Sequence, residues 1–312
     1  VLSLLIVLGV FTGATAQKAN MDARKLQLAL FAISNLYVDS TSETKLVEDA
    51  IVGMLDKLDP HSNYMDPEET KEMTEPLQGN FDGIGIQFNM LTDTLYVIQV
   101  IPGGPSEKVG LMAGDRIVTV DDSLFVGKKV TNERAMRTLK GPKGSQVKLG
   151  VKRMGEKDLL SFTITRGDIP QNTVDAAYML NDEIGYVKVS KFGRTSHVEL
   201  LNALAQLNHK KCKGLIIDLR GNTGGYMEAA IRMVNEFLPE GKLIVYTQGR
   251  KYPRAEEFAN GTGSCQKMPL VVLIDEGSAS ASEIFTGAIQ DNDRGTVVGR
   301  RSFGKGLVQQ PI

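Results

Sequence analysis

Three short runs rich in glycine, serine and charged residues are the places in this sequence where side chains could do chemistry. They are Asp218–Gly225, Gly277–Glu283 and Ser302–Gln310. The first two each follow an apolar, strand-like segment and precede a segment with helical spacing, and such connections are where α/β folds present reactive groups. Glycines in the first run would expose backbone N–H groups beside a helix start, which suits the stabilisation of an oxyanion. A tight glycine-rich connection explains the same run equally well.

Ser280, in the second run, has two interpretations. A serine hydroxyl is a weak nucleophile until a neighbouring base takes its proton. Ser280 also stands three residues before Glu283, and this spacing fits a capping box, in which the serine is a plain helix N-cap. If Ser280 is not the nucleophile, Ser278 and Ser282 are the next candidates.

The candidate base in the third run is Lys305. Glycines on both sides would let other backbone approach it closely, and strand-forming residues follow. A free lysine has a pKa of about 10.4, so burial would have to favour the neutral amine. An exposed loop cation is the alternative, since most lysines are exposed. The chain's histidines, none of which has a context resembling a catalytic triad, are His61, His197 and His209. His61 follows Asp59-Pro60 and is interpreted as a turn residue.

Taken together, the three runs resemble, in order and separation, the signatures of the C-terminal processing peptidases, a serine peptidase family (S41) with a Ser/Lys dyad. The resemblance covers nearly the whole chain. It implies that Ser280 is the nucleophile, that Lys305 is the general base and that Gln309 orients the lysine.

The same resemblance implies an oxyanion hole. Its donors would be the N–H group of Ala281 and that of either Gly224 or Gly225, between which the sequence does not choose. The sequence departs from the family at its end, because the family's core continues past the strand that carries the lysine, whereas this chain stops at Ile312. We therefore expect closing strands to be missing.

Residues 81–166 have a different pattern, with several short strands and one helix over residues 132–139. Within them, Gly83-Ile84-Gly85-Ile86 looks like the carboxylate-binding loop of a PDZ domain, and Gly110–Ile117 resembles the most recognisable run of that module. Such a loop offers N–H groups to a chain-terminal carboxylate, and the next strand pairs with the ligand by β-augmentation. The partners implied are protein or peptide substrates with free C-termini. Turn punctuation is the alternative explanation of the glycines.

The expected organisation has four parts: a truncated signal peptide (1–16), an N-terminal helical segment (17–80), a PDZ domain (81–166) and a C-terminally truncated protease core (167–312). Beyond Gly167, strand patterns, including one at 243–246, alternate with helical patterns, which argues for parallel strands covered by helices. The expected fold class is an α/β protease core of crotonase-like or ClpP-like architecture, with an inserted PDZ β-barrel module and the helical segment.

The first ten residues are almost wholly apolar, and Ala14 and Ala16 have the A-x-A spacing that signal peptidase accepts. We therefore expect export to the periplasm or cell envelope. The alternative is that this stretch begins a buried strand or helix.

Composition excludes several classes of partner. The formal net charge of −1, without a basic cluster, gives no argument for nucleic acid. Cys212 and Cys265 have neither CxxC nor Cys/His spacing, so no metal and no cofactor is expected, and the sequence does not say whether the two cysteines pair. A homo-oligomer or an adaptor protein stays open.

Three functions remain to be separated. The leading one is an endopeptidase that captures a protein's C-terminal tail with its PDZ domain and cleaves nearby through an acyl-enzyme. The second is a catalytically inactive PDZ scaffold of the same fold, against which Ser280, Lys305 and Gln309 argue. The third is an acyl-CoA enzyme of the crotonase class, which would need neither the Ser/Lys pair nor a PDZ domain.

Overall fold

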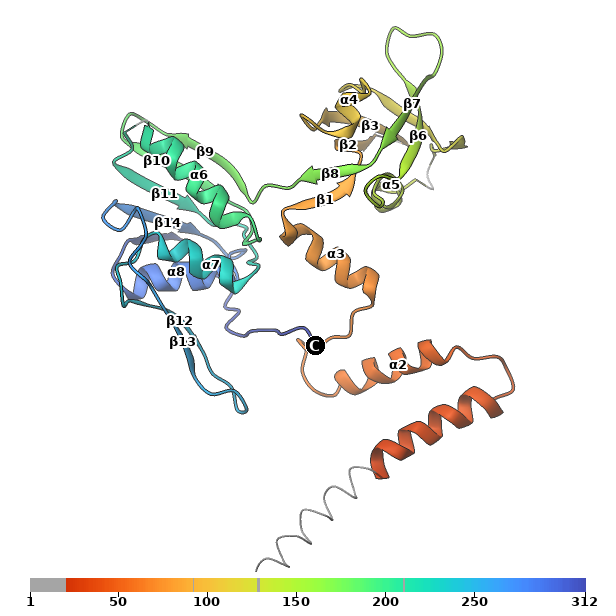
Figure 1. Ribbon diagram of the computed structural model, residues 1–312, viewed down its shortest axis with the longest axis horizontal. Helices are drawn as coiled ribbons and strands as arrows, with labels where there is room; N and C mark the ends of the chain where they lie inside the picture. Colours follow the sequence, from red (N-terminus) through yellow and green to blue (C-terminus); the bar gives the residue numbers. More distant parts are fainter. Residues whose placement is uncertain (1–20, 92, 128–129, 210) are drawn as a thin grey trace, which may run out of the picture. The chain divides into compact units, whose positions relative to one another are not determined.

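The computed structural model describes residues 21–91, 93–127, 130–209 and 211–312 (Figure 1). The predicted signal peptide over residues 1–16 lies outside the described residues. Within the described ranges, no helix combines the length and apolar character needed to cross a lipid bilayer. The chain divides into two units, residues 1–70 with 309–312 and residues 71–308, and each is described by itself.

The described part of the first unit is helical. A helix over residues 21–36 is followed by α2 (Glu43–Leu55), which begins at the N-cap Ser42. The next helix, α3 (Pro67–Gln78), starts in this unit and continues into the second. The predicted helical segment is therefore present over the residues that the structure describes.

A turn separates α2 from α3. The carboxylate of Asp59 accepts hydrogen bonds from the backbone N–H groups of His61 (2.8 Å) and Ser62 (2.9 Å). An aspartate side chain that bonds backbone two residues on replaces helical hydrogen bonding with a local turn. The interpretation of His61 as a turn residue is confirmed.

The second unit contains a six-stranded antiparallel sheet. Its strands are β2 (Ile86–Leu91), β3 (Thr94–Val100), β4 (Arg116–Val120), β5 (Ser123–Leu124), β6 (Gln146–Lys152) and β7 (Leu160–Thr165). They follow the order β2-β3-β4-β6-β7, with β5 paired to β4, so β2 and β7 are the two ends of an open path. Alternate residues of β6 are buried (Val147, Leu149 and Val151), as the period of a half-buried strand requires.

Two helices accompany this sheet, α4 (Pro105–Lys108) and α5 (Asn132–Leu139). The predicted helix over residues 132–139 and the several short strands predicted within residues 81–166 are confirmed. A short antiparallel ribbon of β1 (Asn80–Gly83) and β8 (Gly167–Pro170) pairs the segments that enter and leave this region.

The α/β part is built on a five-stranded sheet. Its strands are β9 (Val174–Met179), β10 (Ile184–Val189), β11 (Gly214–Asp218), β14 (Leu270–Ile274) and β15 (Thr296–Gly299), in the order β15-β14-β11-β10-β9. Four neighbours, β10, β11, β14 and β15, run parallel as predicted, and β9 is antiparallel at the edge.

One face of this sheet is covered by three helices, α6 (Ser196–His209), α7 (Met227–Asn235) and α8 (Ala281–Asp291). The strand residues Val187, Ile217 and Val272 pack in one buried cluster with apolar residues of all three helices. The carboxyl ends of the parallel strands therefore meet the helix starts at one edge, where α/β folds place their sites.

Two sequence predictions differ from the structure. The strand predicted at 243–246 is β12 (Leu243–Thr247), but it pairs with β13 (Ala255–Phe258) in a separate hairpin and not with the main sheet. Ile244 instead joins the buried cluster beneath the helices. The strand predicted after Lys305 is also wrong: residues 300–312 have no strand, and Leu307 and Val308 are exposed because no described strand pairs with them.

Candidate active site

Ser280 lies on the sharp connection between β14 and α8 and is half-buried. Its backbone has φ 56° and ψ −114°, a region that residues with a Cβ rarely enter. Strained residues of this kind persist only when the surroundings hold them, and they cluster at functional sites. A nucleophile on a strained strand-to-helix turn also presents its hydroxyl outward.

The neighbouring serines are already used in the structure. Ser278 is 1% exposed and donates a hydrogen bond to the backbone oxygen of Leu219 (2.8 Å). Ser282 is fully buried and donates to the backbone oxygen of Asn222 (2.8 Å). Both hydroxyls hold the turn in place, which leaves Ser280 as the accessible serine of the run.

The capping interpretation of Ser280 and the nucleophile interpretation are compatible. Ser280 occupies the N-cap position of α8, and its N–H group donates to Oε2 of Glu283 at 2.8 Å. The other half of the capping box is the Ser280 hydroxyl oxygen, which accepts from the N–H of Glu283. An accepting hydroxyl keeps its own proton to give to a base, so Ser280 can cap the helix and still act as a nucleophile.

Glu283 also holds the segment that carries the candidate base. Its Oε2 accepts a hydrogen bond from the N–H of Lys305 (2.8 Å), and its Oε1 accepts from Gly304 N–H and Ser302 Oγ (both 2.7 Å). Burial alone raises the pKa of Glu283, but the hydrogen bonds from Ser302, Ser280, Gly304 and Lys305 outweigh it and keep that pKa below its usual value. One carboxylate oxygen thus joins the backbone of Ser280 to that of Lys305.

Lys305 itself is half-buried, whereas Gly304 and Gly306 are exposed. Gln309 falls in the other unit, where its side-chain amide donates to the backbone oxygen of His61 at 2.7 Å. The structure thus joins Ser280 and Lys305 through Glu283, while the role of Gln309 as the residue that orients the lysine stays a prediction.

The two candidate oxyanion glycines differ in their hydrogen bonds. Gly224 N–H donates to Oδ1 of the buried Asn222 at 2.9 Å, whereas Gly225 N–H donates to no residue that the structure describes. A Cβ on Gly224 would lie 2.8 Å from the Cβ of Ser280, and one on Gly225 would lie 2.3 Å from the oxygen of Phe192. Both positions therefore need glycine. Ala281 N–H begins α8 directly after Ser280.

The sequence analysis assigned no role to a buried cluster beneath this edge. Asp218 is 1% exposed and accepts hydrogen bonds from Tyr186 Oη (2.6 Å) and Arg220 Nη2 (2.7 Å). Burial raises the pKa of Asp218, but the bonds from Arg220 and Tyr186 more than offset it and hold that pKa well below its usual range. Burial and the hydrogen bond to Asp218 raise the pKa of Tyr186 to about 12.

A second unassigned residue is Asp275. Its Oδ1 accepts hydrogen bonds from Gly221 N–H (2.8 Å) and Gly277 N–H (3.0 Å). These bonds tie the glycine-rich run after β11 to the turn that carries Ser280. In the sequence, the two runs share only one feature that could have indicated this contact, which is that each follows a predicted strand. The structure shows that these strands, β11 and β14, are neighbours.

The predicted PDZ loop lies between β1 and β2. Ile84 is 2% exposed, and its backbone oxygen accepts from Ser106 N–H at 3.0 Å. Gly85 has φ 75°, where a side chain is disfavoured, and Ile86 begins β2. Because β2 is an end strand of its sheet, its outer edge suits the addition of a peptide strand.

Metal-ligating side chains and cysteines were candidates for a further site in this chain. No group of three or more His, Cys, Asp or Glu side chains gathers among the described residues as a metal site. Cys212 and Cys265 are both buried and unpaired to each other.

Comparisons with known proteins agree with these features. Residues 183–312 match the family model of peptidase family S41, residues 83–165 match the PDZ domain, and residues 10–70 match the N-terminal domain of the activating protease CtpB. The photosystem II D1 C-terminal processing protease, a solved structure, aligns with a TM-score of 0.49 at 28% identity, covering 91% of this chain and 82% of that one.

Two curated relatives align over most of the chain. It is 38% identical over 296 residues to the carboxy-terminal-processing protease of Bartonella bacilliformis, covering 92% of this chain and 67% of the relative. It is 35% identical over 291 residues to the carboxy-terminal processing protease CtpB of Bacillus subtilis, covering 92% of this chain and 60% of the relative. This chain thus spans 60% to 67% of their lengths. The chain belongs to peptidase family S41, alongside the carboxy-terminal processing proteases.

Proposed function

We propose that this chain is a serine endopeptidase in which Ser280 is the nucleophile and Lys305 is the general base. The observation that carries the proposal is the shared carboxylate oxygen of Glu283, which accepts from Ser280 N–H and Lys305 N–H at 2.8 Å each. That bridge keeps a strained, accessible serine and a half-buried lysine on adjoining loops. Membership of peptidase family S41 supports the same assignment.

The chemistry proceeds in two halves. Neutral Lys305 Nζ takes the proton of Ser280 Oγ while Oγ attacks the carbonyl carbon of the scissile peptide bond. The lysine then returns this proton to the leaving amine, the C–N bond breaks, and the acyl group remains on Ser280 as an ester. The same lysine then takes a proton from a water molecule as the water attacks the ester carbonyl carbon. The bond from this carbon to Ser280 Oγ breaks, the lysine returns the proton to Oγ, and the acid is released.

The negative charge on the carbonyl oxygen needs donors that are in place beforehand. Gly225 N–H and Ala281 N–H fit this role, because Gly224 N–H is engaged by the side chain of Asn222. Asn222 is itself fixed by a hydrogen bond from its Nδ2 to the backbone oxygen of Val189 (3.0 Å). We therefore assign the second donor to Gly225 rather than to Gly224.

Further parts of the proposal concern the rest of the molecule. We assign the core a crotonase-like or ClpP-like architecture. We also propose the four parts given by the sequence, which are the signal peptide, the helical segment, the PDZ domain and the protease core, with boundaries after residues 16, 80 and 166. The loop Gly83–Ile86 would hold the free carboxylate of a substrate's C-terminus, which makes proteins and peptides the partners. The place of action would be the periplasm or cell envelope, where a homo-oligomer or an adaptor could take part.

Labelling by a serine-reactive fluorophosphonate tests the nucleophile. The full chain should be labelled, and Ser280→Ala should lose the label and peptide hydrolysis while stability changes by about 1 kcal/mol, the scale of one helix cap. Ser161→Ala, at an exposed serine of β7, is the matched control and should keep both. Labelling that survives in Ser280→Ala would refute the assignment and leave an inactive scaffold or an acyl-CoA enzyme to be considered.

Capture of C-terminal tails is tested separately. The inactive Ser280→Ala chain should bind a peptide with a free C-terminus about tenfold more tightly than its C-terminal amide, because charge-assisted hydrogen bonds to the loop are lost in the amide. Fluorescence anisotropy with the two labelled peptides measures the ratio. Equal affinities would remove the carboxylate-binding role of residues 83–86 and leave the peptidase assignment untouched.

A further inference from the structure

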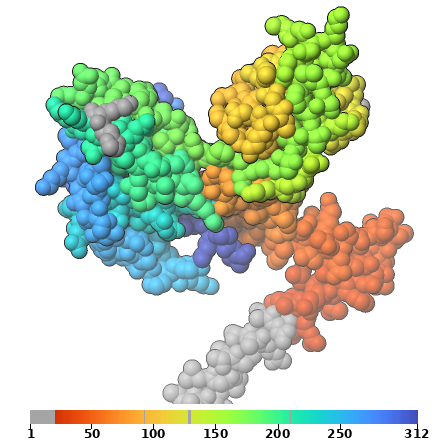
Figure 2. All heavy atoms as spheres, turned by 45° about the horizontal axis from the view of Figure 1, so that its top comes forward, coloured from red at the N-terminus to blue at the C-terminus, as the bar shows by residue number. Residues whose placement is uncertain are grey.

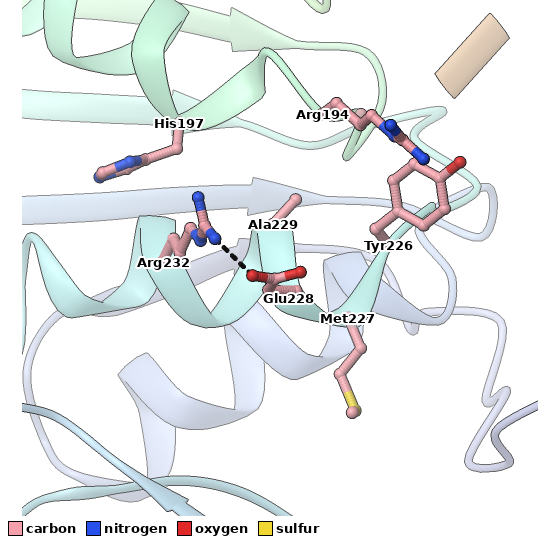
Figure 3. Close-up of a pocket in the computed structure, with 8 residues that line it drawn as sticks. Arg194, His197, Tyr226, Met227, Glu228, Ala229 and Arg232 are labelled. Atoms are coloured by element: carbon pink, nitrogen blue, oxygen red, sulfur yellow. Dashed lines mark hydrogen bonds and ion pairs between the residues drawn. The ribbon is translucent and has the colours of Figure 1, made fainter. Parts of the chain in front are cut away.

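A cavity of about 460 Å³ opens between the starts of α6 and α7 (Figure 3). Its lining includes Gly193, Arg194 and His197 from the α6 side and Tyr226, Ala229 and Arg232 from the α7 side. Gly193 and Ala229 are buried, and their small size leaves the cavity its depth. The polar side chains stand around this floor (Figure 3), and the segments that carry them, residues 193–197 and 226–232, have the green to blue-green colours in Figure 2.

The cavity has an excess of cationic side chains. The lining carries two guanidinium groups, Arg194 and Arg232, against one carboxylate, Glu228. Arg232 forms an ion pair with Glu228 one helical turn away, and His197 Nε2 lies 2.9 Å from Glu236. Arg194 is exposed and forms no side-chain hydrogen bond or ion pair with any residue that the structure describes. Among the cations of the lining, Arg194 is therefore the one that can bind an anionic ligand without breaking an ion pair with a described residue.

Backbone hydrogen bonds connect this cavity to the reaction centre. Phe192 N–H donates to Gly224 O (3.0 Å), and Tyr226 N–H donates to Phe192 O (2.7 Å). The lining residue Tyr226 directly follows the candidate oxyanion glycines. The lining residue Gly193 directly follows Phe192, which is hydrogen-bonded to that glycine segment. Gly224 in turn lies against Ser280, since a Cβ there would be 2.8 Å from the serine Cβ. A ligand at Ser280 that is several residues long would reach the cavity.

We propose that this cavity is a specificity subsite that takes an acidic side chain, aspartate or glutamate, of the peptide substrate. Arg194 binds the carboxylate, and the half-buried Tyr226 and Met227 contact the aliphatic part of the side chain. The inference rests on the proposed peptidase function and adds a preference to it. A guanidinium presents two parallel donors to a carboxylate, so it selects this group over a neutral amide of the same shape.

Paired peptides test the subsite. In a set of cleavable peptides, a single aspartate is placed in turn at each of the four positions on either side of the scissile bond. The full chain's cleavage of each aspartate peptide is compared with its cleavage of the matching asparagine peptide. At one position, kcat/KM should be about fivefold higher for aspartate, the scale of one solvent-accessible ion pair. The preference should shrink as sodium chloride is raised, since salt screens exposed charges.

Variants assign the preference to the cavity. Arg194→Gln should abolish the aspartate preference by lowering kcat/KM for the aspartate peptide to that of its asparagine counterpart, and Arg194→Lys should retain part of the preference. Arg254→Gln is the matched control, because Arg254 is a partly exposed cation directly before β13 that pairs with Glu256 outside the cavity. This variant should keep the preference of the unmodified chain.

The outcomes separate the subsite from the peptidase. A chain that cleaves the peptides but treats aspartate and asparagine alike at every position overturns the subsite alone. A preference that persists in Arg194→Gln does the same. If the chain cleaves no peptide, the proposed peptidase function fails, and the subsite is then tested by binding: Ser280→Ala should bind the better aspartate peptide about fivefold more tightly than its asparagine counterpart. Equal binding there overturns the subsite as well.

Discussion

The two loops that meet at the candidate active site are held in different ways. The turn that carries Ser280 is fixed by several groups, among them the buried Ser278 and Ser282 and the half-buried Asp275. The segment that carries Lys305 is mostly exposed and has no strand. Three of its groups, Ser302 Oγ, Gly304 N–H and Lys305 N–H, donate to the single carboxylate of Glu283.

This difference predicts two kinds of vulnerability. Changes on the nucleophile side disturb packed, hydrogen-bonded structure and should appear first in the free energy of unfolding. Changes on the base side disturb only the placement of a loop, so they should appear in activity while the fold stays intact. Activity would then be set largely by how well the weaker loop is held.

The largest effect is expected at Lys305. Lys305→Arg keeps the positive charge, but arginine stays protonated at any working pH and cannot accept the proton of Ser280. Hydrolysis of a C-terminally unblocked peptide should fall by about 10³-fold or more, the scale of losing a triad member, and Lys305→Ala should be equally inactive. In the unmodified chain, activity should rise with pH because only the neutral amine is a base.

Near wild-type turnover by Lys305→Arg would refute the Ser/Lys mechanism. The search for a base would then turn to His61, His197 and His209. His197 already lies 2.9 Å from Glu236, and His61 lies in the turn after α2, so neither is a strong substitute. Thermal unfolding of Lys305→Arg should match the unmodified chain, as the comparison of the two loops requires.

The next effect is expected at Glu283, which joins the loops. Glu283→Gln keeps the size of the side chain but replaces charge-assisted hydrogen bonds with weaker ones. It also replaces one accepting oxygen by an NH₂ group, which cannot accept the hydrogen bonds that this oxygen receives. We expect kcat to fall by about 30-fold, from the loss of roughly 2 kcal/mol of positioning, with KM little changed. Peptide hydrolysis by both forms measures this split.

Glu276→Gln is the matched control. Glu276 pairs with Arg300 at 2.7 Å, but both side chains are mostly exposed, and an exposed pair contributes little. Its kcat should change less than about twofold. If the two variants lose activity equally, Glu283 has no special part in holding the base.

Much of this arrangement was predictable from local sequence patterns. Alternating strands, the helix over residues 132–139, the α/β alternation and the runs around Ser280 and Lys305 all depend on neighbours in the chain. Glu283 and Lys305 are separated by 22 residues in the sequence, and a local spacing pattern does not reveal a contact over that distance. The Ser280–Glu283 spacing therefore predicted Glu283 only as a capping partner of Ser280. Its second role depends on how the chain after β15 returns to the start of α8.

Other features were missed for related reasons. The hairpin pairing of β12 with β13 was not predicted because a strand pattern does not name its partner. The strand after Lys305 was predicted from β-forming residues, but without a described strand to pair with they remain exposed. Asp275 and Arg194 lie in no motif, and Asp218 lies in one of the three runs but was given no role there. The surroundings of these residues arise only when segments distant in sequence become neighbours.

A smaller effect is expected at Gln309. If this residue only orients the lysine, Gln309→Ala should keep some activity, with a loss of about tenfold in kcat, the scale of one hydrogen bond. Gln310→Ala, one residue further along the same exposed segment, is the control and should be close to the unmodified chain. A loss as complete as that of Lys305→Ala would mean that Gln309 takes part in proton transfer.

The smallest effect is expected at Asp275, on the nucleophile side, and it should appear in the free energy of unfolding. Hydrogen bonds from Gly221 and Gly277 outweigh burial and hold the pKa of Asp275 below its ordinary value of 3.8. A carboxylate with a lowered folded-state pKa contributes stability that is present above the unfolded-state pKa and lost as pH falls through the folded-state one. Asp275→Asn should therefore lower the free energy of unfolding by about 1 kcal/mol at pH 7. The difference should shrink below about pH 3.8, as the unmodified chain takes up the proton.

Urea unfolding at pH 7 and pH 3 measures this difference in the free energy of unfolding. Asp182→Asn, at an exposed position before β10, is the control. A deficit that is equal at both pH values would show that charge on Asp275 does not hold the turn, and the nucleophile loop would then be no better fixed than the base loop.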